Sequence, residues 1–293
     1  MDTPTPEYLT TQELAELLRI KERKVYDLAA SGAVPCTRVV GKLLFPRQEI
    51  QVWLDAARSG PMDNTPLPPI FCGSHDPLLE WALRQSGCGL AAFFDGSLDG
   101  LNRVHARQAV ACGMHIREGE NWNLDTIQKT MGAKPYVVVE FAKRARGLVV
   151  SAGNPLQIKT MADLRNHRVA RRQKMAASEV LFEQMAEQAG LQPNQLAGPS
   201  SPALTEDELA RLVQTGKADA AFGLAAVANG SGLDYVPIIE ERFDLLVWRS
   251  AWFDPPFQTL LNFMKGPAIA ERASEMTGYD LSNLGTIHLN GPI

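Results

Sequence analysis

Three turns in the C-terminal part of the sequence place small or hydroxyl residues between an apolar run and a helical run. The turns lie in IFCGSHDPLLEWAL, LAAFFDGSLDGLNRV and VARRQKMAASEVLFEQM. Ligands of open α/β sheets bind beyond the carboxyl ends of the strands, and the N–H groups and dipole of a helix start suit an anion. Serine adds an uncharged donor. Serine and aspartate also cap helices without binding a ligand, and we interpret Asp76 before Pro77 as such a cap.

A second group of residues with chemical potential is basic and lies near the N-terminus. From Arg19 to Arg47 the chain carries seven Lys or Arg residues, with only Glu22 and Asp27 as acids, whereas the formal net charge of the whole chain is −4. A short basic module on an acidic chain indicates contact with nucleic-acid phosphates. The run KERK is also compatible with a solvated helix face.

The sequence lacks motifs for catalysis and metal binding. The four cysteines have no CxxC spacing, and the five histidines form no HExxH pattern. There is no GxxxxGK[ST] loop, no GxGxxG loop and no serine nucleophile elbow. We therefore expect no metal, no cofactor and no enzyme activity.

The elements around the basic residues are predicted to form a helix-turn-helix. Thr10 and Glu13 fit a capping box at the start of the first helix. A tight turn leads to a second helix over 22–30, which Ser31-Gly32 ends. TRVVGKLLF predicts a hairpin that turns at Gly41-Lys42, and Pro46 is expected to open a third helix.

The remaining sequence predicts a linker and a larger domain. Residues 59–69, SGPMDNTPLPP, contain four prolines and no apolar period, which indicates a semi-stiff linker. From Ile70 onward, short apolar runs alternate with helical patterns, as is typical of α/β domains. The expected organisation is a DNA-binding domain over 1–58, a linker over 59–69 and a ligand-binding domain over 70–293.

Residues 7–57 resemble the excisionase-like winged helix-turn-helix domains of the MerR superfamily. The likeness rests on an ordered series: TTQELAELL, a Val-Tyr pair in the second helix, a glycine before a basic wing, and PRQEIQVWL. In such domains the start of the second helix enters the major groove while basic groups hold phosphates. The resemblance implies contact with double-stranded DNA, weak from one module alone, and hence a homodimer. The implied contact residues are Lys21, Arg23, Lys24, Tyr26, Arg38, Lys42 and Arg47, although Tyr26 could instead cover the wing.

Residues 70–284 resemble the type 2 periplasmic-binding-protein fold, and in particular the molybdate-binding-like domains fused to bacterial helix-turn-helix modules. The matching segments are GSHDPLLEWAL, FFDGSLDGL, GMHI followed by NWN, GLVVSAGNPLQIKTMADL, RRQ with SEVLFEQMAEQAGL, and GKADAAFGLAAVA. The resemblance implies two α/β lobes joined by crossovers near 136–150 and 238–248. Lobe 1 would span about 70–140 and 243–293, and lobe 2 about 141–242. The implied pocket residues are Ser74, His75, Gly96, Ser97, His115, Arg172, Ala177, Ser178 and Asp219.

Several of these pocket residues have alternative roles. Arg172 could hold an oxyanion with paired hydrogen bonds, but Arg171 competes for the inward position. His115 either contacts the ligand or is a hydrogen-bonded structural residue, and Asp219 is expected to cap a turn or to orient Arg172. The third turn departs from the family because it has no glycine. Met175 in that turn either narrows the pocket or lines it for a partly apolar ligand.

Together these observations predict a transcriptional regulator that binds operator DNA and responds to a small anionic effector. Molybdate and tungstate are the leading effectors, and a molybdenum-cofactor-related compound or a small organic acid stays open. The alternative is a protein that binds or delivers its ligand and uses the N-terminal module for protein contacts. No run approaches the ~18 apolar residues of a membrane span, and the N-terminus lacks a signal-peptide pattern. We therefore expect a cytoplasmic protein without membrane contact.

Overall fold

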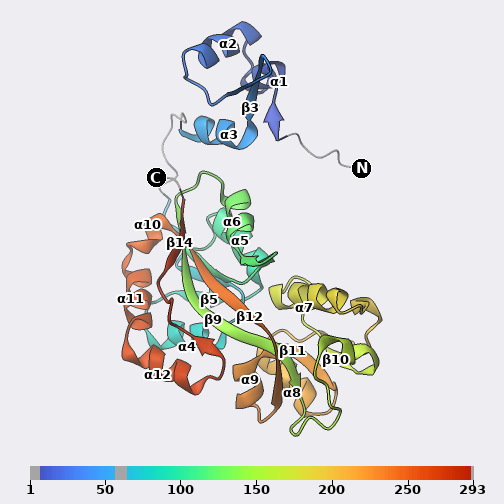
Figure 1. Ribbon diagram of the computed structural model, residues 1–293. Coiled ribbons are helices and arrows are strands. Elements are labelled where there is room, and N and C mark those ends of the chain that lie inside the picture. The colour runs from blue at the N-terminus through green and yellow to red at the C-terminus, as the bar shows by residue number, and fades with distance from the viewer. Residues whose placement is uncertain (1–6, 57–64, 292–293) are drawn as a thin grey trace. The chain divides into compact units, whose positions relative to one another are not determined.

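The computed structural model describes residues 7–56 and 65–291. The chain forms two compact units whose boundary falls between Thr65 and Pro66. The predicted linker over 59–69 lies mostly outside the described residues. The small unit is a helix-turn-helix and the large unit is a two-lobed α/β structure, as the sequence predicts (Figure 1).

The small unit combines three helices with a three-stranded antiparallel sheet in the order β1-β3-β2. The predicted capping box is confirmed, because Thr10 Oγ1 accepts from the Glu13 N–H at 3.2 Å and Glu13 Oε2 accepts from the Thr10 N–H at 2.7 Å. The core is built from Leu14, Val25, Phe45 and Ile50, all buried. The elements are β1 Tyr8–Leu9, α1 Thr11–Leu18, α2 Glu22–Ala30, β2 Thr37–Val39, β3 Lys42–Pro46 and α3 Arg47–Ala56.

Two predicted boundaries in the small unit are wrong by one residue. The hairpin turns at Val40-Gly41 rather than Gly41-Lys42, because Val40 and Gly41 are the two residues with positive φ, 48° and 76°. Two consecutive positive φ values suit the twist of a tight hairpin. Pro46 ends strand β3 instead of opening the third helix, which begins at Arg47.

The large unit is organised around two long antiparallel strands, β9 Tyr136–Val150 and β12 Asp234–Trp248 (Figure 1). They are the two predicted crossovers. At one end of the two strands, β12 pairs with β6 and so joins the lobe 1 sheet. At the other end, β9 pairs with β11 and so joins the lobe 2 sheet. The sheet order is β10-β11-β9-β12-β6-β4-β5, and β13 Tyr279–Asp280 and β14 Ile287–Asn290 also pair with β9.

Lobe 1 is a mixed sheet with helices packed on it: β4, β5 and β6 are parallel, and β12 pairs with β6 in the antiparallel direction. Its core includes Phe71, Leu79, Phe141, Phe243 and Leu260. The helices over Pro255–Met264 and Pro267–Glu275 are separate, because Gly266 acts as the N-cap of the second. The elements are β4 Ile70–Gly73, α4 Pro77–Gln85, β5 Ala91–Phe93, α5 Ser97–His105, β6 Ala111–Met114, β7 Arg117–Glu118, β8 Asn121–Trp122, α6 Leu124–Met131, α10 Arg249–Trp252, α11 Pro255–Met264 and α12 Pro267–Glu275.

Lobe 2 is smaller and uses the other ends of the two long strands. Its cores include Leu148, Phe182 and Phe222 on one side and Val149, Leu209 and Ala221 on the other. The elements are the 3₁₀ helix η1 Met161–Asn166, β10 Val169–Ala170, α7 Ala177–Gln188, the 3₁₀ helix η2 Pro193–Gln195, α8 Glu206–Gln214, β11 Ala220–Leu224 and α9 Ala225–Gly230.

Two glycines let helix α5 lie directly on strand β4. Gly73 has a φ of 105°, and a Cβ added to Gly100 would lie 2.4 Å from the Cα atom of Gly73. Any side chain at position 100 would therefore push the helix off the sheet. This close approach fixes where α5 begins, and so where Ser97 lies.

In the described part of the chain, no helix is long and apolar enough to cross a membrane.

Candidate ligand site and DNA-binding surface

The first two predicted turns meet through their serines. Ser74 follows strand β4 and Ser97 begins helix α5 after Gly96, whose φ is 116°. The Ser74 and Ser97 hydroxyl oxygens lie 2.8 Å apart, and Ser97 Oγ accepts from the backbone N–H of His115 at 3.2 Å. Both serines and His115 are buried. The fold thus brings together three of the residues predicted to line the pocket.

Buried charges occupy the middle of the two crossover strands. Arg144 and Arg146 on β9 both bind Glu241 on β12; the distance from Arg146 Nε to Glu241 Oε2 is 2.9 Å. Arg144 Nη1 also donates to Asp76 Oδ2 at 2.7 Å. His115 Nδ1 lies 2.9 Å from Glu241 Oε2. Arg144, Arg146 and Glu241 are absent from the predicted pocket, although charges inside the apolar strand patterns YVVVEFAKRARGLVV and IIEERFDLLVW are a signal for them.

The chain of charges continues into lobe 2. Glu206 occupies the first turn of α8, where the helix dipole favours a carboxylate. Its Oε1 accepts from Arg146 Nη2 at 3.0 Å and lies 3.7 Å from Arg172 Nη1. Arg172 Nη2 donates to the Leu204 carbonyl at 2.9 Å. Three buried guanidinium groups and three buried carboxylates therefore run from lobe 1 through the crossover strands into lobe 2.

Several polar atoms of this network have no hydrogen-bond partner among the described residues. They are Arg144 Nε, Arg146 Nη1, Arg172 Nε and Nη1, and Glu206 Oε2. Leaving a buried polar group unpaired costs about 1–3 kcal/mol, and more when it is charged. Buried polar atoms of this kind are normally satisfied by ordered water or by a bound ligand, so the network is a candidate binding site.

The ionisation of the network follows from its pairing. Burial raises the pKa of Glu241, but the opposing effect of Arg144, Arg146 and His115 is larger. The pKa of Glu241 therefore lies well below its usual value. Arg146 and Arg172 likewise overcome the effect of burial and lower the pKa of Glu206. Burial lowers the pKa of His115 despite the opposing attraction of Glu241. At neutral pH both glutamates are charged and His115 is neutral.

Two roles assigned from the sequence need correction. Asp76 does cap α4, accepting from the Leu79 N–H at 2.6 Å, but it also binds Arg144 and Tyr279, so it is more than a cap. Asp219 binds Arg168, at 2.6 Å from Nη2 to Oδ1, and does not orient Arg172. This salt bridge at the edge of lobe 2 holds Asp219 away from the charged network.

The hydrogen-bond and salt-bridge partners of Arg171 and Arg172 show which of the two occupies the inward position. Arg171 turns toward Glu179 and Glu183 on α7, whereas Arg172 is buried beside Glu206.

The other predicted pocket residues divide between two places. Ala177 and Ser178 are buried in the first turn of α7. His75 lies to one side, with Nε2 3.0 Å from Glu80 Oε2, and is not joined to the network by any hydrogen bond between described residues.

The two lobes meet at a small apolar pocket. A Cβ added to Gly96 would lie 2.9 Å from the Met175 carbonyl oxygen, so the α5 start touches the third turn. Trp122 of lobe 1 belongs to the lobe 2 core cluster, which also includes Leu181 and Phe182. The pocket has a volume of about 40 Å³, and Met175, 57% exposed, is on its rim. Its lining residues are Leu98, Ile116, Arg117, Met175, Ala177, Val180, Leu181 and Gln184.

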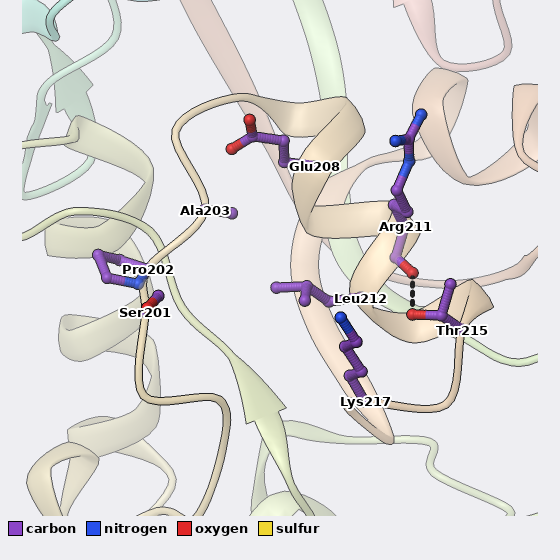
Figure 2. Close-up of a pocket in the computed structure, with 8 residues that line it drawn as sticks. All are labelled: Ser201, Pro202, Ala203, Glu208, Arg211, Leu212, Thr215 and Lys217. Carbon is purple, nitrogen blue, oxygen red and sulfur yellow. Dashed lines mark hydrogen bonds between the residues drawn. The ribbon is translucent and has the colours of Figure 1, made fainter.

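A larger hollow of about 240 Å³ lies on lobe 2 alone (Figure 2). Figure 2 shows the loop with Ser201, Pro202 and Ala203 passing beside the helix that carries Glu208 and Arg211. Arg211 and Lys217 are exposed there, and Thr215 Oγ1 donates to the Arg211 carbonyl at 2.8 Å. A ligand in this hollow would touch one lobe only, so it would not couple to lobe closure.

One group of acidic and histidine residues in the described chain lies close enough to hold a metal ion: Glu140, Asp244 and His288. His288 Nε2 lies 2.6 Å from Glu140 Oε2, and Asp244 accepts from Arg242 Nε at 3.0 Å and from Asn123 Nδ2 at 2.8 Å. Arg242 already supplies the positive charge that a metal would bring. The donor set therefore fits a structural hydrogen-bond network better than a metal site.

The small unit presents every predicted DNA-contact side chain to solvent. Lys21, Arg23 and Lys24 lie at the start of α2, while Val25, which follows them, points into the core. Arg38 and Lys42 lie on the two strands of the hairpin. The exposed set is Lys21, Arg23, Lys24, Tyr26, Arg38, Lys42 and Arg47. A helix start and a hairpin with exposed cations form a surface that suits a nucleic-acid backbone.

Fold and site together define a helix-turn-helix module joined to a two-lobed binding-protein domain. Residues 8–58 match the model of a helix-turn-helix domain, and residues 80–265 match the model of the PBP superfamily domain. The second match covers more than half of the chain, and the chain therefore belongs to the PBP superfamily.

Two curated relatives are similar to this chain. The uncharacterized protein YvgK of Bacillus subtilis (strain 168) is 23% identical over 96% of this chain and 97% of its own. An uncharacterized protein from the 5' region of a 2Fe-2S ferredoxin gene of Clostridium pasteurianum is 25% identical over 37% of this chain and 96% of its own. YvgK thus matches both units.

Two solved structures share the fold. A putative phosphate ABC transporter substrate-binding protein with bound phosphate, from Clostridium perfringens, is 14% identical, with 71% of this chain and 97% of that chain covered and a TM-score of 0.54. An H2O2-bound cysteine-to-serine mutant of Corynebacterium glutamicum OxyR is 11% identical, with 91% and 90% covered and a TM-score of 0.50. At such identities the likeness concerns the fold alone.

Proposed function

We propose that this protein is a cytoplasmic transcriptional regulator that binds operator DNA as a homodimer and responds to a small anionic ligand. The observation that carries the proposal is the pairing of two surfaces on one chain. The small unit exposes seven predicted DNA-contact residues, and the large unit holds unpaired guanidinium N–H groups where its two lobes meet. A protein that only stores its ligand has no need of the first surface.

The ligand is proposed to bind between the lobes, against the Ser74–Ser97 pair, Arg146 and Arg172. The hydroxyls and the start of α5 supply neutral donors, and the arginines supply charge. Charge-assisted hydrogen bonds are about twice as strong as neutral ones. From the family resemblance, molybdate, tungstate and a molybdenum-cofactor-related compound are the first effectors to test. The bound phosphate of the Clostridium perfringens protein adds phosphate to that set.

Ligand binding is proposed to act through the crossover strands. Arg144, Arg146 and Glu241 lie where β9 and β12 pass from one lobe to the other, so a ligand that engages them favours the closed arrangement. A ligand changes an equilibrium only by its differential affinity for the two states. Coupling of ~1–3 kcal/mol between ligand and DNA is typical of allosteric proteins.

The decisive experiment is a mobility-shift assay with the DNA that lies upstream of the gene. The double variant Arg23→Ala/Lys24→Ala removes two exposed charges from the start of α2 and is expected to abolish the shift. The control Lys159→Ala/Lys265→Ala removes the same charge from exposed positions of the large unit, and should shift DNA as the wild type does. Unchanged DNA binding by the first variant would favour the alternative, a ligand-binding or delivery protein whose small unit contacts other proteins.

A further inference from the structure

We infer that the ligand carries two groups side by side: an anionic oxygen that binds the Arg146–Arg172 pair, and an O–H or N–H donor that binds Glu206. This inference rests on the proposed function, because it names the chemistry of the ligand in the same site. It makes Glu206 the residue that determines which acids are accepted. Hydrogen phosphate and small 2-hydroxy acids have this chemistry, whereas sulfate, molybdate and tungstate do not at neutral pH.

The geometry places one acceptor among several donors. Glu206 Oε1 is held by Arg146 Nη2 at 3.0 Å and lies 3.7 Å from Arg172 Nη1. All three side chains are more than nine-tenths buried. The three side chains are therefore neighbours around Glu206 Oε1 and are shielded from bulk water.

The unpaired atoms of these three side chains are of both kinds. Arg146 Nη1 and Arg172 Nε and Nη1 are donors without an acceptor among the described residues, and Glu206 Oε2 is an acceptor without a donor. An anion alone would satisfy the arginines and leave Glu206 Oε2 unpaired. A molecule with an anionic oxygen and a neighbouring donor satisfies both sets at once.

Glu206 also excludes acids that have no donor. Its two arginine neighbours keep it ionised, and an ionised carboxylate only accepts hydrogen bonds. An oxyanion with no proton would bring another negative oxygen against it in a buried site, where charge repulsion is weakly screened. A site built to bind a hydroxyl rejects an analogue without one far more strongly than an apolar pocket does, because its polar group is left unpaired.

The first test needs only the full-length wild-type protein and matched pairs of ligands. Isothermal titration calorimetry at pH 7 compares phosphate with sulfate, and lactate with propanoate; within each pair the main difference is the donor. We expect the donor-bearing member of at least one pair to bind at least ten-fold more tightly than its partner, and molybdate to bind no more tightly than sulfate. Tighter binding of molybdate or sulfate than of both donor-bearing probes would overturn the inference, and so would the absence of binding by all of these probes.

The second test changes the acceptor. Glu206→Gln keeps the shape of the side chain but presents an amide N–H. For the ligand pair that the wild type discriminates, the ratio of the two affinities should therefore shift at least ten-fold toward the ligand without a donor. Glu208→Gln is the control, because it makes the same change two residues further along α8, where the residue is exposed. Circular dichroism verifies that each variant is folded. If Glu206→Gln increased the affinity for both ligands of a pair equally, Glu206 would be a simple counter-ion, and its selective role would be refuted.

These outcomes are separate from the failure of the proposed function. Loss of ligand selectivity leaves the mobility-shift result of Arg23→Ala/Lys24→Ala untouched. Conversely, if the protein discriminates between the ligands of a pair but binds no DNA, the inference about the ligand still holds, and the protein is then a ligand-binding or delivery protein.

Discussion

His115, which follows β6, and Glu241 on β12 are joined by a 2.9 Å hydrogen bond between His115 Nδ1 and Glu241 Oε2, and both side chains are buried. The bond links the end of a lobe 1 strand to the crossover pair. Glu241 also binds Arg144 and Arg146, so one carboxylate serves the histidine and both arginines. Loss of either arginine or of Glu241 leaves the others with unbalanced charge.

The His115–Glu241 pair predicts a pH dependence of stability. Burial lowers the pKa of His115, so below its usual value near 6.5 the unfolded chain binds a proton that the folded chain does not. The free energy of unfolding therefore falls as the pH drops below that value, by at most about 1.4 kcal/mol per pH unit for one site. Urea unfolding at pH 7 and pH 5 should show a steeper loss in the wild type than in His115→Gln. Parallel losses in the two proteins would rule out this contribution, since the other histidines are present in both.

Breaking the charged network should be far more costly than breaking a surface pair. Arg144→Met leaves the buried Asp76 without its cationic partner and removes one of the two arginines that bind Glu241, and such losses cost about 3–5 kcal/mol. Arg84→Met is the control, because Arg84 pairs with Glu80 on an exposed helix face with its side chain 74% exposed, and exposed pairs contribute about 0–1 kcal/mol. Guanidinium unfolding of both variants measures the difference. Similar stability of the two would show that the Arg144 pairs are not required for the fold.

The elements are predictable from sequence where local rules act alone. The Thr10 capping box and the α2 bounds follow from capping and glycine stops. Ser74 and Ser97 can be found because one follows an apolar strand pattern and the other begins a helix. Helix α6, which begins after Asn123 with its φ of 67°, is missed although Leu124, Ile127 and Met131 recur at helical spacing.

The charged centre of the site is harder to predict. Arg144, Arg146 and Glu241 are far apart from Glu206 and Arg172 in sequence, and only the register of β9 against β12 brings Arg144 opposite Glu241. A sequence pattern gives the faces of a strand but not its register with a distant partner.

The same limit explains the error at Asp219. The sequence leaves this residue either to cap a turn or to orient Arg172, whereas the parallel pairing of β10 with β11 places it beside Arg168. Nothing in the local pattern of either strand distinguishes these two partners, because the choice depends on how the strands align.

The contact between α5 and β4 predicts opposite effects of two glycine replacements. Alanine usually stabilises a helix by about 0.5–1 kcal/mol relative to glycine. In Gly100→Ala the new Cβ would lie 2.4 Å from the Gly73 Cα atom, and overpacking of this kind costs about 1–3 kcal/mol. Gly230→Ala in α9 meets no atom within 4 Å, so it should be neutral or slightly stabilising. Differential scanning calorimetry should show a lower melting temperature for the first variant only; an unchanged value for Gly100→Ala would mean that the helix shifts at little cost.

The hydroxyl of Ser97 gives a direct test of the ligand position. Ser97 Oγ is shared between Ser74 Oγ and the His115 N–H, and an anionic ligand is proposed to accept a hydrogen bond from this pair. A ligand at 100 times its dissociation constant stabilises the folded chain by about 2.7 kcal/mol. A thermal-shift screen of molybdate, tungstate, phosphate and small organic acids against the full-length chain should therefore identify binders by a rise in melting temperature.

For a ligand identified in this way, Ser97→Ala should reduce the rise and weaken the affinity measured by calorimetry. A lost hydrogen bond to a charged group corresponds to about 1.5–3 kcal/mol, which is roughly 10- to 150-fold in affinity. Ser274→Ala, on an exposed position of α12 where the hydroxyl donates to the Glu271 carbonyl, is the matched control and should bind as the wild type does. Because the Ser97 hydroxyl also accepts from the His115 N–H, the melting temperature of ligand-free Ser97→Ala must be measured as well. Undiminished affinity in Ser97→Ala would remove the α5 start from the site and leave the arginines of the crossover strands as the anchor of the ligand.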